Sequence, residues 1–265
     1  MKILITGGNG VIGKFLANKL KDHEVYNPTR QSVDFTNREH VDKFFASHSR
    51  FDLVLHCAAV GGSRLHKDSE DVLDDNLKMY YNILHHKNSY DKFITFGSGA
   101  EMHASNTPYG LSKKVIAQSI MGNYNFYNIR IFGLFGEGEL ETRFIRSALT
   151  NYINKTPITI HNNKFMDFFY MEDLWTLVKY YIDTQYPPKV VDCVYTNHKM
   201  SLNGMANYVN ELGDHIVEII RTRDVRHLFP EKYVGSEKTL QSLPIELIGF
   251  KEGLKIEYEK YKLRN

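Results

Sequence analysis

Two side chains that could move a proton together lie four residues apart near the middle of this 265-residue chain. Tyr109 and Lys113 would share one face of a helix, because side chains four residues apart are neighbours on a helix surface. A free tyrosine has a pKa of about 10, so it is a poor proton-transfer group at neutral pH. A nearby ammonium group favours the phenolate and lowers that pKa toward the working range.

A serine upstream can complete this constellation. Ser98 follows the apolar run Phe93–Gly97, which predicts a strand that ends with a hydroxyl at the carboxyl edge of a sheet. That hydroxyl can hydrogen-bond a substrate oxygen on which charge develops. The chain has 17 tyrosines, so a Tyr-x-x-x-Lys spacing by itself is expected by chance. The placement of all three residues after one strand therefore carries the prediction that Ser98, Tyr109 and Lys113 are catalytic.

A glycine-rich turn near the start of the chain predicts a phosphate-binding site. Gly7, Gly10 and Gly13 follow a short apolar run and open an apolar, helix-like segment. Early glycines let a backbone turn sharply and approach a pyrophosphate, a later one lets the helix pack on the strand, and the helix start supplies unpaired amides. Glycines also serve ordinary turns, so the flanking strand and helix carry the prediction. The predicted cofactor-binding residues here are Gly7, Asn9, Gly10, Val11, Ile12 and Gly13.

The segment after the second predicted strand indicates which dinucleotide binds. NAD sites usually place an acid there to bind the ribose 2′-hydroxyl, whereas this chain has Thr29 and Arg30. A guanidinium suits a 2′-phosphate, which it can hold through paired hydrogen bonds. The sequence therefore favours NADPH/NADP over NAD, and the alternative is that Arg30 is a solvated loop residue.

Short apolar runs alternate with helix-period segments through the first half of the chain, which predicts an α/β fold. We expect a Rossmann-type doubly wound parallel sheet with a small C-terminal substrate-binding cap. Residues 1–135 would form the dinucleotide-binding core, to which later segments return, and residues 136–265 would be mostly the cap. The expected strands are Lys2–Thr6, Glu24–Asn27, Leu53–Cys57, Lys92–Phe96, Asn128–Phe132, Ile158–Ile160, Val190–Tyr195 and Ile216–Ile220. The expected helices are Val11–Leu20, a segment after Thr36, Glu70–His86, Tyr109–Met121, Arg143–Ile153, Asp173–Thr184 and Leu202–Leu212.

The second of these helices has a sequence signature of its own. Thr36 is followed three residues later by Glu39, the spacing of a capping box in which the acid reaches back to the amide of the cap residue. The sequence therefore predicts Thr36 as the N-cap.

Composition excludes several classes of protein. Two cysteines, Cys57 and Cys193, are too few for a disulfide framework or a zinc cluster and fit a reducing compartment. The net charge of +2 comes from interspersed charges, so we expect no nucleic-acid partner. The chain has no apolar run long enough for a membrane span and no signal-peptide layout at its start, so a cytoplasmic protein is expected. The 12 histidines show no metal-ligand spacing and are expected at the surface.

Together these motifs resemble the extended short-chain dehydrogenase/reductases, the nucleotide-sugar epimerase/dehydratase/reductase family, along nearly the whole length. The turn Gly7–Gly13, the triad Ser98, Tyr109 and Lys113, and the late segment Asp167–Asp173 match its landmarks. The resemblance implies that Ala58 and Ala59 line the cofactor. It also implies that Asn76 and Asn82 are the paired asparagines of the following helix, with Asn76 at the cofactor site.

Within that family the chain looks most similar to GDP-fucose synthase-like reductases. Thr29-Arg30 resembles their NADPH-binding segment, and Val60-Gly61-Gly62 resembles their loop after the third strand, which places Gly61 and Gly62 near the substrate. The resemblance implies that NADPH delivers hydride to C4 of a 4-keto sugar while Tyr109 donates a proton to the C4 oxygen. Lys113 would also hold the nicotinamide ribose.

The departures from that family are informative. Ala100 and Arg143 stand where those synthases carry the cysteine and histidine that epimerise C3 and C5, so reduction without epimerisation is expected. Glu101 lies one position too late for the acidic pair of the related dehydratases. Relatives carry an arginine for the nucleotide diphosphate where Met166 stands. The residues proposed to bind the nucleotide diphosphate in its place are Arg143, Arg146 and Lys164.

Three functions therefore stay open, headed by an NADPH-dependent C4-ketoreductase acting on a nucleotide-linked 4-keto sugar, for which the resemblance indicates GDP. The others are an epimerase that retains bound NAD, and an NADP-binding regulatory protein without catalysis. A homodimer through the two central helices is weakly favoured, although the same apolar spacing is expected for packing on the sheet. The residues considered for that face are Tyr80, Tyr81, Ile83, Leu84, Ile116 and Ile120.

Overall fold

A computed structural model of the chain describes residues 1–63, 67–196, 199–222 and 231–263. These residues divide into two units. Unit 1 comprises Met1–Arg130 and Tyr180–Val191, and unit 2 comprises Ile131–Lys179 and Asp192–Asn265. The segment Tyr180–Val191 thus groups with the N-terminal residues in unit 1.

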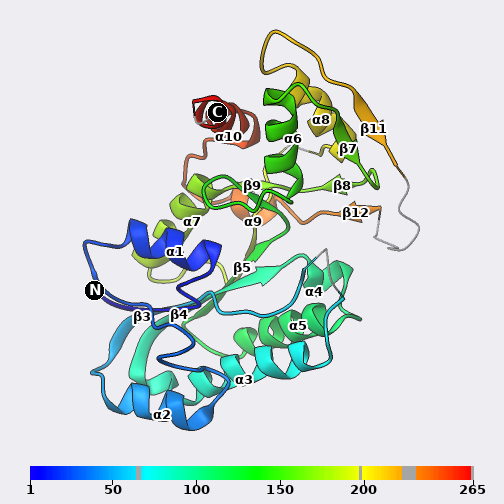
Figure 1. The fold of residues 1–265 in the computed structure, drawn as a ribbon. Helices are drawn as coiled ribbons and strands as arrows, with labels where there is room; N and C mark the ends of the chain where they lie inside the picture. Colours follow the sequence, from blue (N-terminus) through cyan, green and yellow to red (C-terminus); the bar gives the residue numbers. More distant parts are fainter. Residues whose placement is uncertain (64–66, 197–198, 223–230, 264–265) are drawn as a thin grey trace. The chain divides into compact units, whose positions relative to one another are not determined.

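Unit 1 is built on a six-stranded sheet (Figure 1). In spatial order its strands are β10 (Val190–Asp192), β5 (Phe126–Ile131), β4 (Tyr90–Ser98), β3 (Phe51–His56), β1 (Lys2–Thr6) and β2 (Glu24–Tyr26). β1 pairs in parallel with both β2 and β3, and β3 pairs in parallel with β4. The strand order therefore reverses at β1 and β3, the point at which open α/β sheets bind ligands outside the carboxyl ends of their strands.

Helices cover both faces of this sheet. Figure 1 places α1 (Val11–Lys19) on one face and α2 (Arg38–Ala46), α3 (Asp71–His85) and α5 (Pro108–Met121) on the other. Two short elements, η1 (Lys87–Ser89) and α4 (Ala100–His103), flank β4. α5 begins where the sequence dictates, because Thr107 Oγ1 accepts a hydrogen bond from the Gly110 amide and Pro108 occupies the first helical position.

The predicted capping box of α2 is wrong. The N-cap is Asn37, whose side chain accepts hydrogen bonds from the amides of Glu39 and His40. The Thr36 hydroxyl instead donates to Asp34, at 2.8 Å, and Glu39 pairs with Lys43 on the helix surface. Asparagine is as good an N-cap as threonine, so the helix starts one residue later than the motif indicated.

An aromatic core lies between the sheet and the helices α2, α3 and α5. It contains Tyr80, Ile83, Ile116 and Ile120, each no more than 3% exposed. These four residues were considered for a dimer face, and the structure contradicts that role because they pack inside unit 1. Of the same set, Tyr81 is 45% exposed.

Unit 2 combines short strands with four longer helical segments. Its strand pairs are β6 (Leu134–Phe135) with β9 (Phe169–Tyr170), β7 (Ile158–Ile160) with β11 (Ile219–Arg221), and β8 (Phe165–Met166) with β12 (Lys232–Tyr233). Its helices are α6 (Phe144–Ile153), α7 (Met171–Asp183, whose last residues belong to unit 1), α8 (Leu202–Asn210), the short α9 (Lys238–Gln241) and α10 (Phe250–Lys262). The helices α6, α8 and α10 pack with the short strands around a second hydrophobic cluster.

Several elements of unit 2 differ from expectation, and the short elements β6, β8, β9, β12 and α9 were not predicted. The strand predicted at Ile216–Ile220 begins only at Ile219, and Ile216 is 83% exposed. The helix α10 was not predicted. It buries Phe250, Leu254, Tyr258 and Tyr261 along one face. A Cβ on its Gly253 would lie 2.8 Å from the Tyr170 ring, so the glycine permits close packing.

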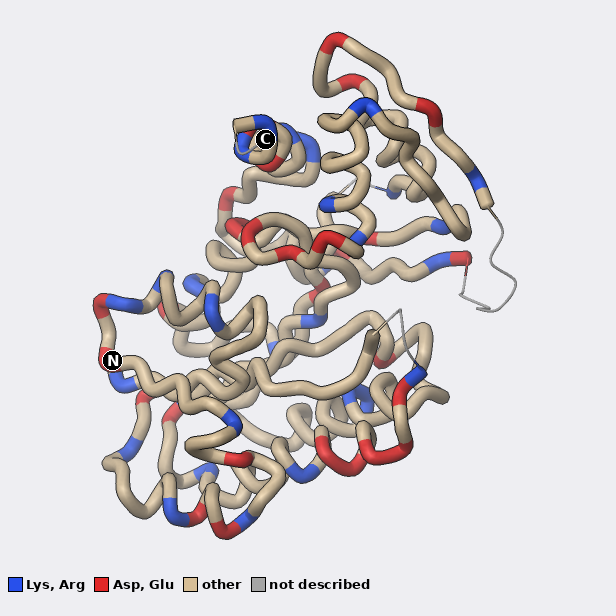
Figure 2. The backbone as a smooth tube through the Cα atoms, viewed as in Figure 1, with Lys and Arg blue, Asp and Glu red and all other residues tan. Residues whose placement is uncertain are grey.

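Charged residues are interspersed over each unit (Figure 2). An exception is the start of α3, whose first turn carries Asp71 and Asp74. Acidic groups there favour the helix start. Among the described residues, no helix is long and apolar enough to cross a membrane, and no cluster of His, Cys, Asp or Glu could hold a metal ion.

Candidate active site

The glycine turn between β1 and α1 has the geometry of a phosphate cradle. Gly7 has a φ of +66°, and a Cβ on it would lie 2.7 Å from the Ala58 backbone. A Cβ on Gly13 would lie 2.3 Å from the Gly7 carbonyl oxygen, so this glycine lets α1 pack on the turn as expected. Gly10 is the N-cap of α1 without a side-chain cap, and the first turn has no acid. Unpaired amides therefore face the exposed tip formed by Asn9, Gly10 and Val11.

A buried hydrogen-bond network holds this turn against β3. The Ala58 amide donates to Thr6 Oγ1 at 3.2 Å, and Thr6 Oγ1 lies 2.9 Å from His56 Nδ1. A threonine hydroxyl can donate one hydrogen bond and accept two, so the direction of the Thr6–His56 bond follows the tautomer of the ring. Burial lowers the pKa of His56 to about 3, so its ring is neutral. The expectation of surface histidines is wrong for His56, which is 2% exposed.

Tyr109 and Lys113 lie together on α5, as their spacing predicted. The Lys113 ammonium is 5.7 Å from the centre of the Tyr109 ring and donates to the Phe96 carbonyl at 2.9 Å. Lys113 is 6% exposed, and burial lowers its pKa from the ordinary value. Gly62 packs against the same ring, because a Cβ on it would lie 2.9 Å from two Tyr109 ring carbons.

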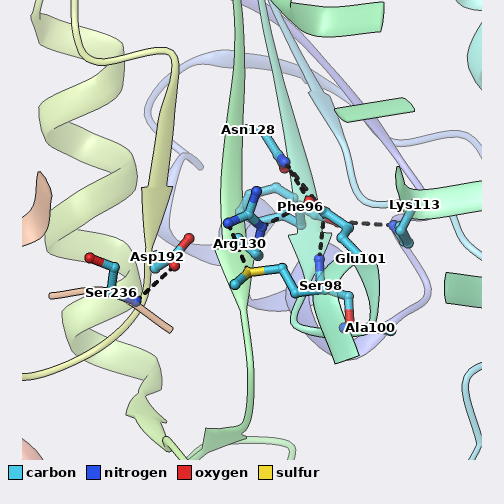
Figure 3. A network of polar contacts seen from close by, with 10 residues as sticks. Phe96, Ser98, Ala100, Glu101, Lys113, Asn128, Arg130, Asp192 and Ser236 are labelled. Carbon is cyan, nitrogen blue, oxygen red and sulfur yellow. Dashed lines mark hydrogen bonds and ion pairs between the residues drawn. The ribbon is translucent and has the colours of Figure 1, made fainter. Parts of the chain in front are cut away.

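Ser98 ends β4 in a tightly held turn (Figure 3). Its Oγ accepts a hydrogen bond from the Ala100 amide at 3.1 Å, and its own amide donates to Glu101 Oε1 at 2.9 Å. Phe96, whose carbonyl binds Lys113, lies two residues before it on the same strand. β4 and α5 therefore bring the predicted triad to the carboxyl edge of the sheet in unit 1.

The side chain of Asn76 makes three hydrogen bonds within the chain, and its place at the cofactor site stays a prediction. Its side-chain amide accepts from the Val60 amide and donates to the Val60 carbonyl and to Ser112 Oγ, at 2.9 to 3.1 Å. It therefore fixes the loop after β3, which leads from Ala58 and Ala59 to Gly61 and Gly62. Asn82 makes a separate bond to the Phe35 carbonyl.

Arg30 lies after β2 with an exposed side chain, 69% accessible, and its Nε is 3.9 Å from Asp34 Oδ2. A Cβ on Gly8 would lie 2.7 Å from Asn27 Cβ, so the segment that leads to Arg30 begins beside the glycine turn. An exposed ion pair at this distance contributes little to stability, which leaves the guanidinium available to a ligand.

The residues proposed to hold the diphosphate lie in unit 2. Arg143 is exposed at the N-cap of α6. The Arg146 guanidinium lies 3.6 Å from the centre of the Tyr261 ring, and the Lys164 ammonium lies 5.7 Å from the centre of the Tyr233 ring. Met166, where relatives carry arginine, is 1% exposed in the core of unit 2. Its apolar side chain fits that core without a buried charge.

Sequence reasoning missed the role of Glu101. Its carboxylate is buried beneath the Ser98 turn, and Asn128 and Arg130 of β5 contact it. A signal was present, because Ser98 and Glu101 have the S-x-x-E spacing of a capping box. The partners on β5 carried no such signal, since they become neighbours only through the order of the sheet.

Known proteins are similar to this chain in sequence or in fold. A CDP-abequose synthase from Yersinia pseudotuberculosis is 24% identical over 81% of this chain and 85% of its own length. A GDP-L-colitose synthase from the same organism is 26% identical over 58% of this chain, but the match spans only 48% of that protein. Among solved structures, a GDP-mannoheptose C4 reductase from Campylobacter jejuni with NADP bound is similar, with a TM-score of 0.75. It is 18% identical, and 98% of each chain is covered.

The model of one protein family, the NAD dependent epimerase/dehydratase family, matches residues 3–193. That range contains the glycine turn, the Ser98 turn and the Tyr109–Lys113 pair, so the match and the geometry concern the same residues. The chain therefore belongs to the NAD dependent epimerase/dehydratase family and is an NAD(P)-dependent oxidoreductase.

Proposed function

We propose that this enzyme reduces the C4 ketone of a nucleotide-linked 4-keto sugar and uses NADPH to do so. The observation that carries the proposal is the buried Lys113 ammonium beside Tyr109, on the strand edge that also presents Ser98. A phenol next to a fixed ammonium can release a proton to an oxygen that gains charge.

When bound, the cofactor supplies a hydride to C4 of the sugar and leaves as NADP⁺. The chain's own residues supply the proton and the hydrogen bond that the C4 oxygen needs. Tyr109 gives its hydroxyl proton to the C4 oxygen, and the Ser98 hydroxyl hydrogen-bonds that oxygen as charge develops on it. Lys113 holds the nicotinamide ribose, and the glycine turn with the start of α1 binds the pyrophosphate.

Two observations support NADPH rather than NAD. The exposed Arg30 guanidinium lies on the segment that begins beside the glycine turn, and a similar reductase structure contains NADP. The named relatives act on differently linked sugars, one CDP-linked and one GDP-linked. A thermal-shift comparison of GDP, CDP, UDP and dTDP, each with NADP⁺, would identify the base, because a ligand of the folded state raises the melting temperature.

We propose further that the enzyme does not epimerise its substrate. Ala100 is 6% exposed and has no ionisable group, and Arg143 is permanently cationic. Neither residue can remove a proton from carbon. Arg143, Arg146 and Lys164 would instead hold the diphosphate, for which their charge is suited.

The test is reduction in D₂O with unlabelled NADPH and nucleotide-linked 4-keto-6-deoxy sugars, followed by NMR of the product. Epimerisation exchanges the C3 or C5 hydrogen with solvent, whereas reduction places the cofactor's hydrogen at C4. We expect a C4 alcohol without deuterium at C3 or C5. Deuterium at those carbons would show an epimerase, and turnover without added NADPH would show an enzyme that retains its nucleotide.

A further inference from the structure

Glu101 is a buried acid that the proposed reaction does not use. Its carboxylate, with the residue 5% exposed, accepts the Ser98 amide at 2.9 Å and Arg130 Nε at 2.8 Å. Asn128 Nδ2 lies 3.3 Å from both oxygens. Figure 3 shows the carboxylate between the Ser98 turn and the side chains of β5. The Ser98 amide and two side chains of β5 therefore contact this acid.

The contacts between Ser98 and Glu101 are reciprocal. The Ser98 side chain accepts a backbone amide at the start of α4, and the Glu101 side chain reaches back to the Ser98 amide. The pair differs from a capping box in that the N-cap of α4 is Gly99 and Ser98 Oγ bonds the Ala100 amide, not the Glu101 amide. The bond from Ala100 uses an oxygen lone pair of Ser98 and not its hydroxyl proton. Gly97 permits the arrangement, since a Cβ there would lie 2.2 Å from Glu101 Oε1.

Glu101 and Lys113 both bind the end of β4, because Glu101 Oε1 accepts the Ser98 amide and Lys113 Nζ donates to the Phe96 carbonyl two residues before it. Burial lowers the pKa of Lys113, and the charge of Glu101 opposes that fall. The other titratable groups around the ammonium are Cys57 and His56 beside it in the core and Tyr109 on its own helix. Burial keeps Cys57 a neutral thiol by raising its pKa, and it keeps His56 neutral by lowering its pKa to about 3. Arg130, on β5, pairs with Glu101 at 2.8 Å.

We propose that Glu101 is a positioning residue with two effects: its carboxylate fixes the Ser98 turn, and its charge keeps Lys113 protonated beside Tyr109. The inference rests on the proposed roles of Ser98, Tyr109 and Lys113. It assigns Glu101 no contact with substrate or cofactor. A negative charge favours the protonated forms of neighbouring groups, so its removal makes the Tyr109–Lys113 pair lose its proton at lower pH.

The test compares Glu101→Gln with Glu101→Ala by the pH dependence of kcat/KM for ketone reduction. Glutamine keeps an oxygen that can accept the Ser98 amide but removes the charge. We therefore expect its alkaline limb to move to lower pH by roughly one unit, with kcat at the optimum within about fivefold of wild type. Alanine also removes the anchor, so we expect the same shift together with a further kcat loss of roughly tenfold or more.

Glu70→Gln is the matched control, because Glu70 is exposed at the start of α3 and solvent screens its charge. It should leave the pH profile unchanged. An unshifted profile in Glu101→Gln, or a kcat in Glu101→Ala equal to wild type, overturns the proposal. If Glu101→Gln does not fold because Arg130 is left unpaired, Glu101→Gln/Arg130→Met is compared with Arg130→Met, and the same shift is expected.

A second measurement separates this inference from the proposed function. The pH dependence of the NADPH dissociation constant follows Lys113 without any sugar substrate. If wild type reduces no keto sugar, the proposed function fails. The charge effect is still supported if the NADPH dissociation constant of Glu101→Gln changes at a lower pH than that of wild type. If that change occurs at the same pH in wild type and in Glu101→Gln, the charge effect is overturned.

Discussion

At the scale of single residues, the site depends on atoms that have almost no room to move. Gly62 lies against the Tyr109 ring, and Gly7 lies against the Ala58 backbone. Lys113 is held by one carbonyl of β4. Catalytic groups need this precision, because a displacement of about 1 Å can cost roughly a hundredfold in rate.

Gly62→Ala tests the packing of Tyr109. The new methyl would lie 2.9 Å from two ring carbons at a φ of +70°, so we expect the ring to shift and kcat/KM to fall roughly 10- to 100-fold. Gly249→Ala is the control. Gly249 also has a positive φ, +86°, but a Cβ there meets nothing within 4 Å, so it carries the conformational cost alone. Equal activities for the two variants would refute the contact.

Arg30→Ala tests the choice of cofactor. Loss of charge-assisted bonds to a 2′-phosphate should raise the dissociation constant of NADPH roughly 10-fold or more, while that of NADH stays the same. Arg38→Ala removes another exposed arginine, which pairs with Asp42 on α2, and should change neither dissociation constant. Fluorescence titration measures the dissociation constants of NADPH and NADH for wild type, Arg30→Ala and Arg38→Ala. An Arg30→Ala protein that binds NADPH as tightly as wild type would remove the argument for the 2′-phosphate.

At the scale of elements, the first half of the chain was predictable because each strand is a short apolar run and each helix has a regular period. The α10 helix was missed because lysines, glutamates and Gly253 masked the spacing of Phe250, Leu254 and Tyr258. Ser98, Tyr109 and Lys113 follow from motif and position. Asn128 and Arg130 do not, because no local pattern on β5 reveals which neighbouring turn its side chains will meet.

Asn76 joins three elements, so its removal should cost more than that of a similar buried asparagine. Asn76→Ala loses bonds to both backbone groups of Val60 and to Ser112. We expect the free energy of unfolding to fall by roughly 2–4 kcal/mol. Asn82→Ala loses a bond to the Phe35 carbonyl and should cost about 1–2 kcal/mol. Urea denaturation measures the free energy of unfolding of both variants. A loss for Asn76→Ala that is equal to or smaller than the loss for Asn82→Ala would show that Asn76 does not hold the loop after β3.

At the scale of the whole molecule, the two units should respond oppositely to pH. In unit 1, burial lowers the pKa of His56 from 6.5 to about 3, so stability is lost as pH falls through that range. In unit 2, burial raises the pKa of Glu139 from 4.5 to about 8. The folded state then favours the protonated acid, so stability is lost as pH rises from 4.5 to about 8.

Glu139→Gln tests this opposition. A neutral amide avoids the cost of burying a charge, so it should stabilise the protein more at pH 8 than at pH 5.5, by roughly 2 kcal/mol between the two. Urea unfolding is followed by the fluorescence of Trp175, the single tryptophan of the chain. A gain that is the same at both pH values would show that Glu139 titrates normally.

The most direct measurement is kcat/KM for Tyr109→Phe, with NADPH and a nucleotide-linked 4-keto sugar that wild type reduces. The variant lacks only the hydroxyl proton that the C4 oxygen should receive, and its ring still fills the space beside Gly62 and Lys113. We predict a loss of roughly 10²- to 10⁴-fold, with the dissociation constant of NADPH nearly unchanged. A Tyr109→Phe enzyme that turns over at the wild-type rate would show that the proton comes from another group.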